Sequence, residues 1–230
     1  MDRKKYKILS VGGSIIIPKT GFDVGFLKKF RALILAHIKK GERFVLVVGG
    51  GATCRNYQAA AALAAGLKDV QLDLLGIKAT YLNAEFVRAL FGSLAYEEII
   101  KNPTLKIKTS RPIVVAGGWK PGASTDYDAV LLAKQFGAKE VFNLSNIDFV
   151  YDKDPNKFKD AKKIISASWP EFKKIIGGKW KPGANLPFDP KAAKTAQKAK
   201  ISVSFLKGTD LKSLETALSG RKFRGTIIGS

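Results

Sequence analysis

The stretch that decides the fold is Phe44-Val-Leu-Val-Val-Gly-Gly-Gly51. Its five apolar residues have the length of a strand, and such a run is typical of a parallel strand that is buried on both faces. The glycines then turn the chain into an alanine-rich helix that extends through Leu67. A buried strand, a glycine turn and a helix in this order indicate an α/β fold.

The same unit occurs elsewhere in the chain. Residues 7–11 form an apolar strand before Gly12-Gly13-Ser14, and residues 112–116 form another before Gly117-Gly118. Residues 145–163 are expected to be a long loop or hairpin, and residues 177–187 a flexible loop. We predict helices over 23–40, 69–91, 126–136, 168–176, 189–200 and 210–218, and strands over 140–144, 202–206 and 226–228.

Composition narrows the class of protein. The chain has 230 residues, of which 46% are hydrophobic and 26% charged, and this excludes disordered, collagen-like and coiled-coil proteins. No apolar run reaches the roughly 18 residues of a membrane span. The single cysteine, Cys54, cannot form an internal disulfide. We therefore expect a soluble cytoplasmic protein without a membrane partner.

The charge of the chain is strongly positive. Forty Lys and Arg residues against nineteen Asp and Glu give a net charge of +21. Such a charge favours anionic ligands, but lysines spread over solvated faces explain it better. Only eight of the forty are Arg, and we use the charge only as support for a ligand that carries phosphate.

Glycine turns at the carboxyl ends of parallel strands are suited to phosphate binding, because the backbone can approach the ligand closely. Neither the P-loop motif nor the G-x-G-x-x-G motif is present. With one cysteine and one histidine, His37, a Cys/His metal site is excluded, and we expect His37 on the surface of a helix. Cys54 follows a glycine turn at a helix start, where thiol pKa values fall, although a small filler residue explains it better. Phosphoryl transfer, which depends on positioning and electrostatics, fits what is left.

Asp73 shares a helix face with Ile77, Thr80 and Ala84. Its carboxylate is placed either to accept hydrogen bonds from a ribose or to remain solvated near a helix start, and spacing alone leaves both interpretations open.

An ordered set of motifs over nearly the whole chain resembles the amino acid kinase superfamily, and within it the archaeal-type uridylate (UMP) kinases. The set comprises Gly12-Gly-Ser14 with Pro18, Val47-Val-Gly-Gly-Gly51 with Arg55, Asp73-Leu-Leu-Gly-Ile77 with Thr80 and Asn83, Gly117-Gly-x-x-Pro-Gly-x-Ser-Thr-Asp126, Ser145-Asn-Ile-Asp148 with Val150-Tyr151 and Asp154-Pro155, and Phe188-Asp-Pro-x-Ala-Ala193. The resemblance implies an α/β/α sandwich with a mainly parallel sheet, in which residues 1–136 form the acceptor side and residues 137–230 the ATP side of one domain. It also implies ATP-dependent conversion of UMP to UDP with Mg²⁺ in a homo-oligomer, usually a hexamer, with no specific nucleic-acid partner.

The resemblance assigns roles residue by residue. It implies catalytic roles for Arg55 and Asp189 and no protein metal ligand. It implies ATP binding by Gly13, Ser14, Gly51, Arg55, Ser145, Asn146, Tyr151 and Asp154. It implies UMP binding by Gly50, Asp73, Trp119, Lys120, Pro121, Gly122, Ala123, Ser124 and Thr125.

The chain departs from the family pattern at several positions. Ser10 stands where many members carry a strand lysine, and Phe149 replaces a glycine near the ATP loop. Tyr81 replaces an arginine that often precedes the position of Asn83. The charge on the transferred phosphoryl group must then be neutralised by Arg55, Mg²⁺ or a lysine, for which the candidates are Lys120 and Lys181.

Other functions are compatible with parts of the pattern. Related kinases act on N-acetylglutamate, carbamate or isopentenyl phosphate, but the first usually has the strand lysine and the last relies on a histidine near its substrate. A basic nucleic-acid-binding module leaves the co-occurrence of Asp73, Asp126 and Asp154 unexplained. A storage or scaffold role also remains open, since a fold does not determine function.

Overall fold

The predicted strand-glycine-helix units form a single central sheet in the computed structural model, which describes residues 6–177 and 186–229. Seven strands lie in the order β3-β2-β1-β4-β8-β9-β7. They are β1 (Tyr6–Val11), β2 (Arg43–Val48), β3 (Ile113–Ala116), β4 (Glu140–Ser145), β7 (Ser166–Ala167), β8 (Ser202–Lys207) and β9 (Thr226–Ile228).

The sheet is parallel from β3 to β8, because each crossover passes through helix and brings the chain back to the same end. Strand β9 is antiparallel to β8, and β7 pairs in parallel with β9. Outside this sheet, the predicted hairpin over residues 145–163 consists of β5 (Val150–Tyr151) and β6 (Lys163–Ile164), which pair antiparallel. The short β7 was not predicted from the sequence.

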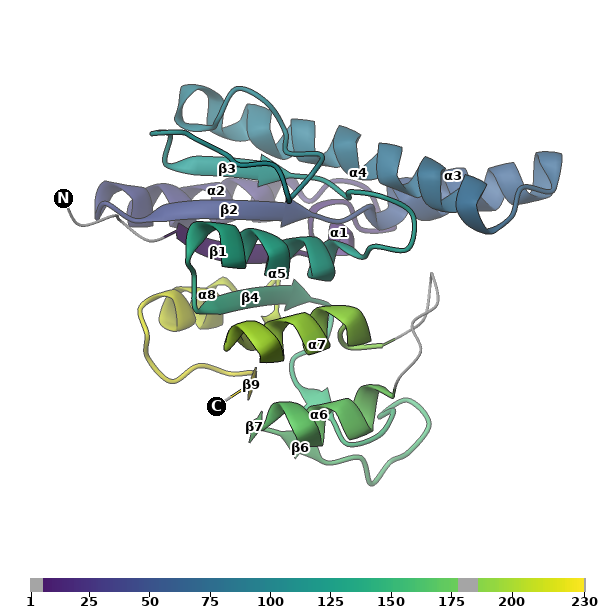
Figure 1. The fold of residues 1–230 in the computed structure, drawn as a ribbon, viewed down its shortest axis with the longest axis vertical. Helices are drawn as coiled ribbons and strands as arrows, with labels where there is room; N and C mark the ends of the chain where they lie inside the picture. Colours follow the sequence, from purple (N-terminus) through teal and green to yellow (C-terminus); the bar gives the residue numbers. More distant parts are fainter. Residues whose placement is uncertain (1–5, 178–185, 230) are drawn as a thin grey trace.

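Helices cover both faces of the sheet, as Figure 1 shows with α5 and α7 in front of it and α2 and α8 behind. The helices are α1 (Gly13–Ile16), α2 (Val24–Lys39), α3 (Gly51–Ala65), α4 (Asp69–Phe91), α5 (Thr125–Phe136), α6 (Trp169–Ile176), α7 (Pro190–Ala199) and α8 (Leu211–Leu218), with a 3₁₀ turn η1 (Gly92–Leu94). Strand residues alternate between the two resulting cores. Val45 and Val47 of β2 pack with α5, α6 and α7, whereas Leu46 and Val48 pack with α2, α4 and α8. The expected three-layer α/β/α sandwich is confirmed.

Local sequence signals account for several helix ends. The side chains of Asp23, Ser168 and Asp210 accept backbone N–H hydrogen bonds at the starts of α2, α6 and α8. At α6 the predicted capping box is complete, since Glu171 also accepts from the backbone of Ser168.

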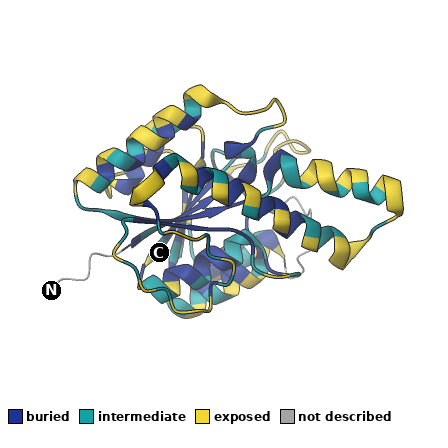
Figure 2. Cartoon of the chain, turned by 90° about the horizontal axis from the view of Figure 1, so that it is seen from above, coloured by how far each residue is buried: buried dark blue, intermediate teal, exposed yellow. Residues whose placement is uncertain are grey.

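Helices α3 and α4 form a long hairpin that projects from one end of the molecule (Figures 1 and 2). The outer part of this hairpin is exposed over most of its surface. Its exposed apolar side chains include Tyr57, Leu63 and Val70. Among the described residues, no helix combines the length and the apolar character that crossing a bilayer requires.

The expectation of a surface position for His37 is wrong. Its side chain is only 2% exposed, and its ring lies edge-on to Phe44. His37 Nδ1 lies 2.7 Å from a carboxylate oxygen of Glu42, in the loop that precedes β2. Because α2 packs its apolar face on the sheet and His37 lies on that face, the imidazole is enclosed together with the leucines and phenylalanines of the helix.

Candidate active site

The predicted phosphate-binding turns lie together at the carboxyl ends of β1 and β2. Gly12 and Gly13 follow β1, and Gly49, Gly50 and Gly51 follow β2, the neighbouring parallel strand. Because parallel neighbours end at the same edge of a sheet, the two turns are adjacent. Residues almost forty positions apart in sequence therefore form one glycine surface.

Gly13 and Gly51 make the closest approach between these turns. A Cβ atom on Gly13 would lie 2.0 Å from the Gly51 nitrogen, and one on Gly51 would lie 2.4 Å from the Gly13 carbonyl oxygen. Gly51 also has a φ of +60°, a conformation that favours glycine. Any side chain at either position would force the turns apart.

Asn83 of α4 holds the second turn in place. Its Nδ2 donates hydrogen bonds to the carbonyl oxygens of Gly49 at 2.9 Å and Gly50 at 2.8 Å. At the start of α3 no acidic side chain lies in the first turn and no side chain caps the helix, while the Ala52 N–H donates to the carbonyl oxygen of Ile17. A helix start of this kind favours phosphate.

A cation stands beside the first turn. The exposed side chain of Arg55 on α3 donates a hydrogen bond from Nη2 to the Ser14 hydroxyl over 3.2 Å. The structure therefore brings together four of the residues predicted to contact ATP phosphates, namely Gly13, Ser14, Gly51 and Arg55.

The segment after β3 carries the residues predicted to bind the acceptor, and we call residues 117–125 the acceptor loop. The N–H of Gly118 donates to Thr80 Oγ1 on α4 over 2.7 Å, and the N–H of Gly122 donates to Asp73 Oδ2 over 2.8 Å. The spacing that placed Asp73 and Thr80 on one helix face is thus confirmed as a surface that contacts this loop. The Asp73 carboxylate is thus not left to solvent alone, and its role at a ribose stays a prediction.

The remaining part of the acceptor loop is ordered by local contacts. The Lys120 ammonium lies 3.9 Å from the centre of the Trp119 ring, a cation–π contact. Ser124 caps α5 by accepting from the Tyr127 N–H, and its hydroxyl donates to Asp189. Thr125 begins α5.

Asp189, predicted to be catalytic, is buried and occupies both carboxylate oxygens with protein contacts. One oxygen accepts from the Lys191 N–H at the start of α7, and the other accepts from Ser124. These contacts tie the acceptor loop to α7. Its catalytic role stays a prediction.

A buried carboxyl group contacts Ser10, which stands where many family members carry a strand lysine. Ser10 Oγ donates to Asp126 Oδ1 over 3.0 Å, and Asn143 Nδ2 donates to the same oxygen over 2.8 Å. Burial raises the pKa of Asp126 to about 6, against these two hydrogen bonds that lower it, with nearby Asp189 raising it further. Without the lysine, β1 and β4 bind this carboxyl with neutral donors only.

Asp126 belongs to one of the family motifs, whereas Asp128 was not predicted from the sequence as a functional residue. Asp128 is fully buried on the first turn of α5, and burial raises its pKa to about 7. The signal available in the sequence was a pair of carboxylates two residues apart at the start of a predicted helix. Their burial depends on how α5 packs, which that spacing does not reveal.

Of the residues predicted to surround adenosine, Ser145 ends β4 and Asn146 follows it. The Tyr151 hydroxyl donates to Asp148 over 3.2 Å, and Asp154 accepts hydrogen bonds from Asn156 within its own turn. Nearby, a cavity of about 270 Å³ is lined by Asp148, Lys207, Thr209, Asp210 and Arg224. This cavity includes the loops that follow β4 and β8, and in the sheet β4 lies next to β1 and β8 lies next to β4.

Cys54, Phe149 and Lys181 were also named from the sequence. Burial raises the pKa of the Cys54 thiol, which agrees with the favoured interpretation of Cys54 as a small filler residue and contradicts the alternative of a thiol activated by the helix start. Phe149, which replaces the family's glycine, is buried beneath the Lys163 ammonium at 4.9 Å. Lys181, the other candidate lysine, lies outside the described residues.

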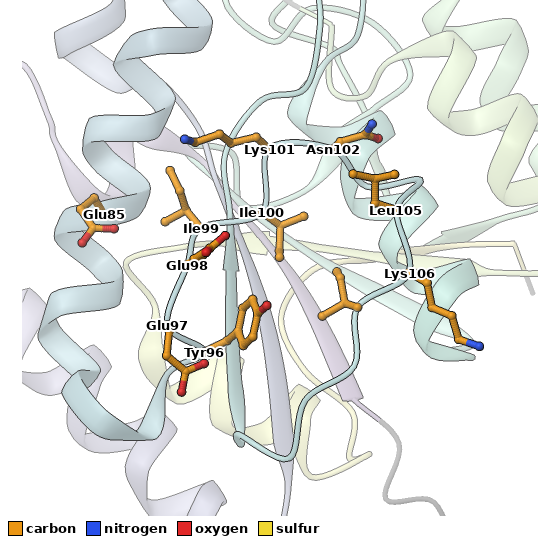
Figure 3. A pocket seen from close by; sticks show the side chains of 11 residues that line it. Glu85, Tyr96, Glu97, Glu98, Ile99, Ile100, Lys101, Asn102, Leu105 and Lys106 are labelled. Carbon is orange, nitrogen blue, oxygen red and sulfur yellow. The ribbon is translucent and has the colours of Figure 1, made fainter.

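A second cavity, of about 640 Å³, lies away from the glycine turns. Figure 3 shows it between Glu85 of α4 and the segment from Tyr96 to Ile107, which runs beside β3. Both acidic and basic side chains line it, including Glu97, Glu98, Lys101 and Lys106. None of the residues predicted to bind ATP or UMP lines this cavity.

The sequence model of the amino acid kinase family matches residues 5–207. The chain belongs to the amino acid kinase family. This family member is 30% identical to the uridylate kinase of Methanobrevibacter smithii over 224 residues, which are 96% of this chain and 98% of the relative. It is 36% identical to the uridylate kinase of Methanosarcina barkeri over 214 residues, 92% of this chain and 90% of the relative.

A solved structure also matches this family member along its length. The crystal structure of uridylate kinase from Archaeoglobus fulgidus aligns with a TM-score of 0.82 and 29% identity, covering 97% of this chain and 99% of that one. The expected resemblance to archaeal uridylate kinases within the amino acid kinase family is thereby confirmed.

Proposed function

We propose that this chain is a UMP kinase, which transfers the γ-phosphoryl group of ATP to UMP and releases UDP and ADP. The observation that carries the proposal is the hydrogen bond between Asp73 and Gly122, because it brings a carboxylate suited to a ribose onto the acceptor loop. The full-length similarity to archaeal uridylate kinases supports the same reaction.

The glycine turns provide the donor side of this reaction. Backbone N–H groups near Gly13, Ser14 and Gly51 would bind ATP phosphates, and Arg55 would neutralise charge on the transferred group. Ser145, Asn146, Tyr151 and Asp154 would surround the adenosine, as the family resemblance implies.

The acceptor loop provides the other side. Asp73 would bind the ribose of UMP, and residues 119–125 with Gly50 would surround its base and phosphate. Lys120 is the described lysine that this loop carries, and its ammonium is held over Trp119. It is therefore our candidate for the cation that compensates for Ser10 on β1.

We expect Mg²⁺ to reach the site bound to the phosphates of ATP. In the part of the chain that the structure describes, no group of three or more His, Cys, Asp or Glu side chains is placed to hold a metal ion. Mg²⁺ in kinase sites is held largely by substrate phosphates and waters, so the protein need supply few ligands. When bound, the cation would neutralise charge on the phosphates.

We further propose that the chain forms a homo-oligomer, as a hexamer by family resemblance, through the projecting α3–α4 hairpin. Leu63 near its tip is 89% exposed, and Tyr57 on the same helix is 58% exposed. Exposed apolar side chains gathered on a projection indicate an interaction surface.

The test of the reaction is ADP release from ATP and Mg²⁺ with UMP, CMP, N-acetylglutamate, carbamate or isopentenyl phosphate as acceptor. We expect turnover with UMP to exceed that with every other acceptor. Turnover with another acceptor alone would retain the ATP half of the proposal and reassign residues 119–125.

A further inference from the structure

Three consecutive N–H groups attach the start of the acceptor loop to three different parts of the protein. Gly117 donates to the carbonyl oxygen of Ile100, beside the sheet edge, and Gly118 donates to Thr80 on α4. Trp119 donates to Asp128 Oδ2 on α5 over 3.0 Å. The last of these contacts is the only one of the three made by a carboxylate.

Among the described residues, the Asp128 side chain forms one hydrogen bond, the contact with the Trp119 N–H. Its side chain is 0% exposed, and Oδ1 has no hydrogen-bond partner among the described residues. A buried carboxylate with one unpaired oxygen costs folding free energy. The contact that Asp128 does make is directed at the loop that would bind the acceptor.

The charges around Asp128 come from three helices. Asp126 on α5 and Asp189 at the start of α7 oppose its ionisation, while Lys191 on α7 favours it. Tyr81 on α4 faces the same region: burial is the main cause of its raised pKa, and the charge of Asp128 raises that pKa further. Burial is the largest influence and places the pKa of Asp128 at about 7.

We propose that Asp128 is a positioning residue for the acceptor, because its carboxylate holds the Trp119 N–H and thereby sets the path of the acceptor loop. The inference rests on the proposed UMP kinase function. Lys120 lies over the Trp119 ring, so a displacement of Trp119 displaces the cation as well. Asp73 holds the same loop three residues later, at Gly122. Both ends of the segment from Trp119 to Gly122 therefore donate a backbone N–H to a carboxylate, one on α5 and the other on α4.

The strength of the hydrogen bond from the Trp119 N–H to Asp128 depends on whether the carboxyl group is ionised. An ionised carboxylate accepts a stronger hydrogen bond than a neutral carboxyl group or amide. Binding of UMP should therefore improve as the pH rises through about 7, beyond any change caused by the phosphate of UMP itself. Asp128→Asn keeps the shape and an acceptor oxygen but removes the titration.

The first experiment measures the KM for UMP and the KM for ATP between pH 5.5 and pH 8.5. We expect the KM for UMP of Asp128→Asn to be about fivefold above that of the parent protein at pH 8, and to converge with it below pH 6. The KM for ATP should stay unchanged throughout. Glu215→Gln, which removes an exposed carboxylate on α8, serves as the control and should follow the parent protein.

The second experiment does not depend on activity. Amide hydrogen exchange of residues 117–123 is compared at equal pH in the parent protein, Asp128→Asn and Asp128→Ala. We expect faster exchange at Trp119 in Asp128→Ala, with Asp128→Asn between the two.

The outcomes separate the two proposals. Parallel pH profiles for the parent protein and Asp128→Asn, or equal rises in both KM values, would overturn the positioning role. So would unchanged exchange at Trp119 in Asp128→Ala. If the parent protein does not phosphorylate UMP, the proposed function fails, while the exchange measurement still decides whether Asp128 holds the loop.

Discussion

Asp73 accepts the Gly122 N–H at 2.8 Å, so the carboxylate expected at the ribose is already engaged with the acceptor loop. The two residues are 49 positions apart and come from α4 and from the loop that precedes α5. A ribose that binds to Asp73 must either share this carboxylate with Gly122 or replace that contact. Acceptor binding and loop position are therefore linked through one side chain.

Replacing Asp73 tests this link. Asp73→Asn should raise the KM for UMP about tenfold, since a hydrogen bond to a charged group contributes roughly 1.5–3 kcal/mol, while the KM for ATP changes little. Steady-state kinetics with each substrate varied in turn measures both values. Asp69→Asn, on an exposed residue of the same helix, is the control. Equal rises in the two KM values would show that Asp73 does not belong to the acceptor side.

Arg55→Ala should lower kcat by a factor of about 100 to 1,000, the usual result of removing one group that stabilises charge in the transition state. Because Arg55 is exposed and its side chain, within residues 6–177 and 186–229, hydrogen-bonds only to Ser14, thermal unfolding should change little. Arg221→Ala, also exposed, is the matched control. Unchanged turnover would assign Arg55 a structural role.

The contact between the two glycine turns can be tested with a matched pair of glycines. Gly51 and Gly66 have φ values of +60° and +63°, but only at Gly51 does added Cβ meet backbone, at 2.4 Å. Gly66→Ala should cost about 1 kcal/mol of stability from backbone strain alone. Gly51→Ala should cost clearly more and abolish ATP binding. Urea unfolding and nucleotide titration measure the two effects, and equal destabilisation would show that the turns can separate.

Stability should depend on pH through Asp128. Its pKa is about 7 in the folded protein and near 3.8 in the unfolded chain, so between these values the folded state retains a proton that the unfolded state has lost. The contribution of this group to the free energy of unfolding therefore falls as the pH rises, by up to about 1.4 kcal/mol per pH unit. Urea unfolding of the parent protein and Asp128→Asn at pH 5 and pH 8 measures this, and identical pH dependences would contradict it.

The proposed role of the projecting α3–α4 hairpin in oligomer formation can be tested by placing a charged side chain on it. Leu63→Lys on α3 should reduce the oligomeric mass measured by light scattering, because a buried interface does not accommodate an unpaired ammonium. Leu105→Lys changes an exposed leucine outside the hairpin and should leave the mass unchanged. Retention of the full mass in Leu63→Lys would exclude this part of α3 from the interface.

Much of the fold follows from local patterns in the chain. The run Phe44–Val48 and the glycines after it predict β2 and the start of α3, and the apolar spacing from Asp69 to Phe91 predicts α4 with both bounds as found. The sequence also predicts the cap at Ser168. These features depend on neighbours within a few residues, and the amino acid kinase motifs lie in the turns between them.

The contacts that make the site depend on segments distant in sequence. The approach of Gly13 to Gly51, the engagement of Asp73 by Gly122 and the burial of His37 all arise when helices pack on the sheet. A residue's spacing indicates which face of its element it occupies, but the environment of that face is created by other elements. The sequence by itself determined the main helices and strands, their order and the family, because these depend on local patterns. Only the tertiary structure decided which carboxylates are buried and which of them hold the acceptor loop, because those contacts join distant segments.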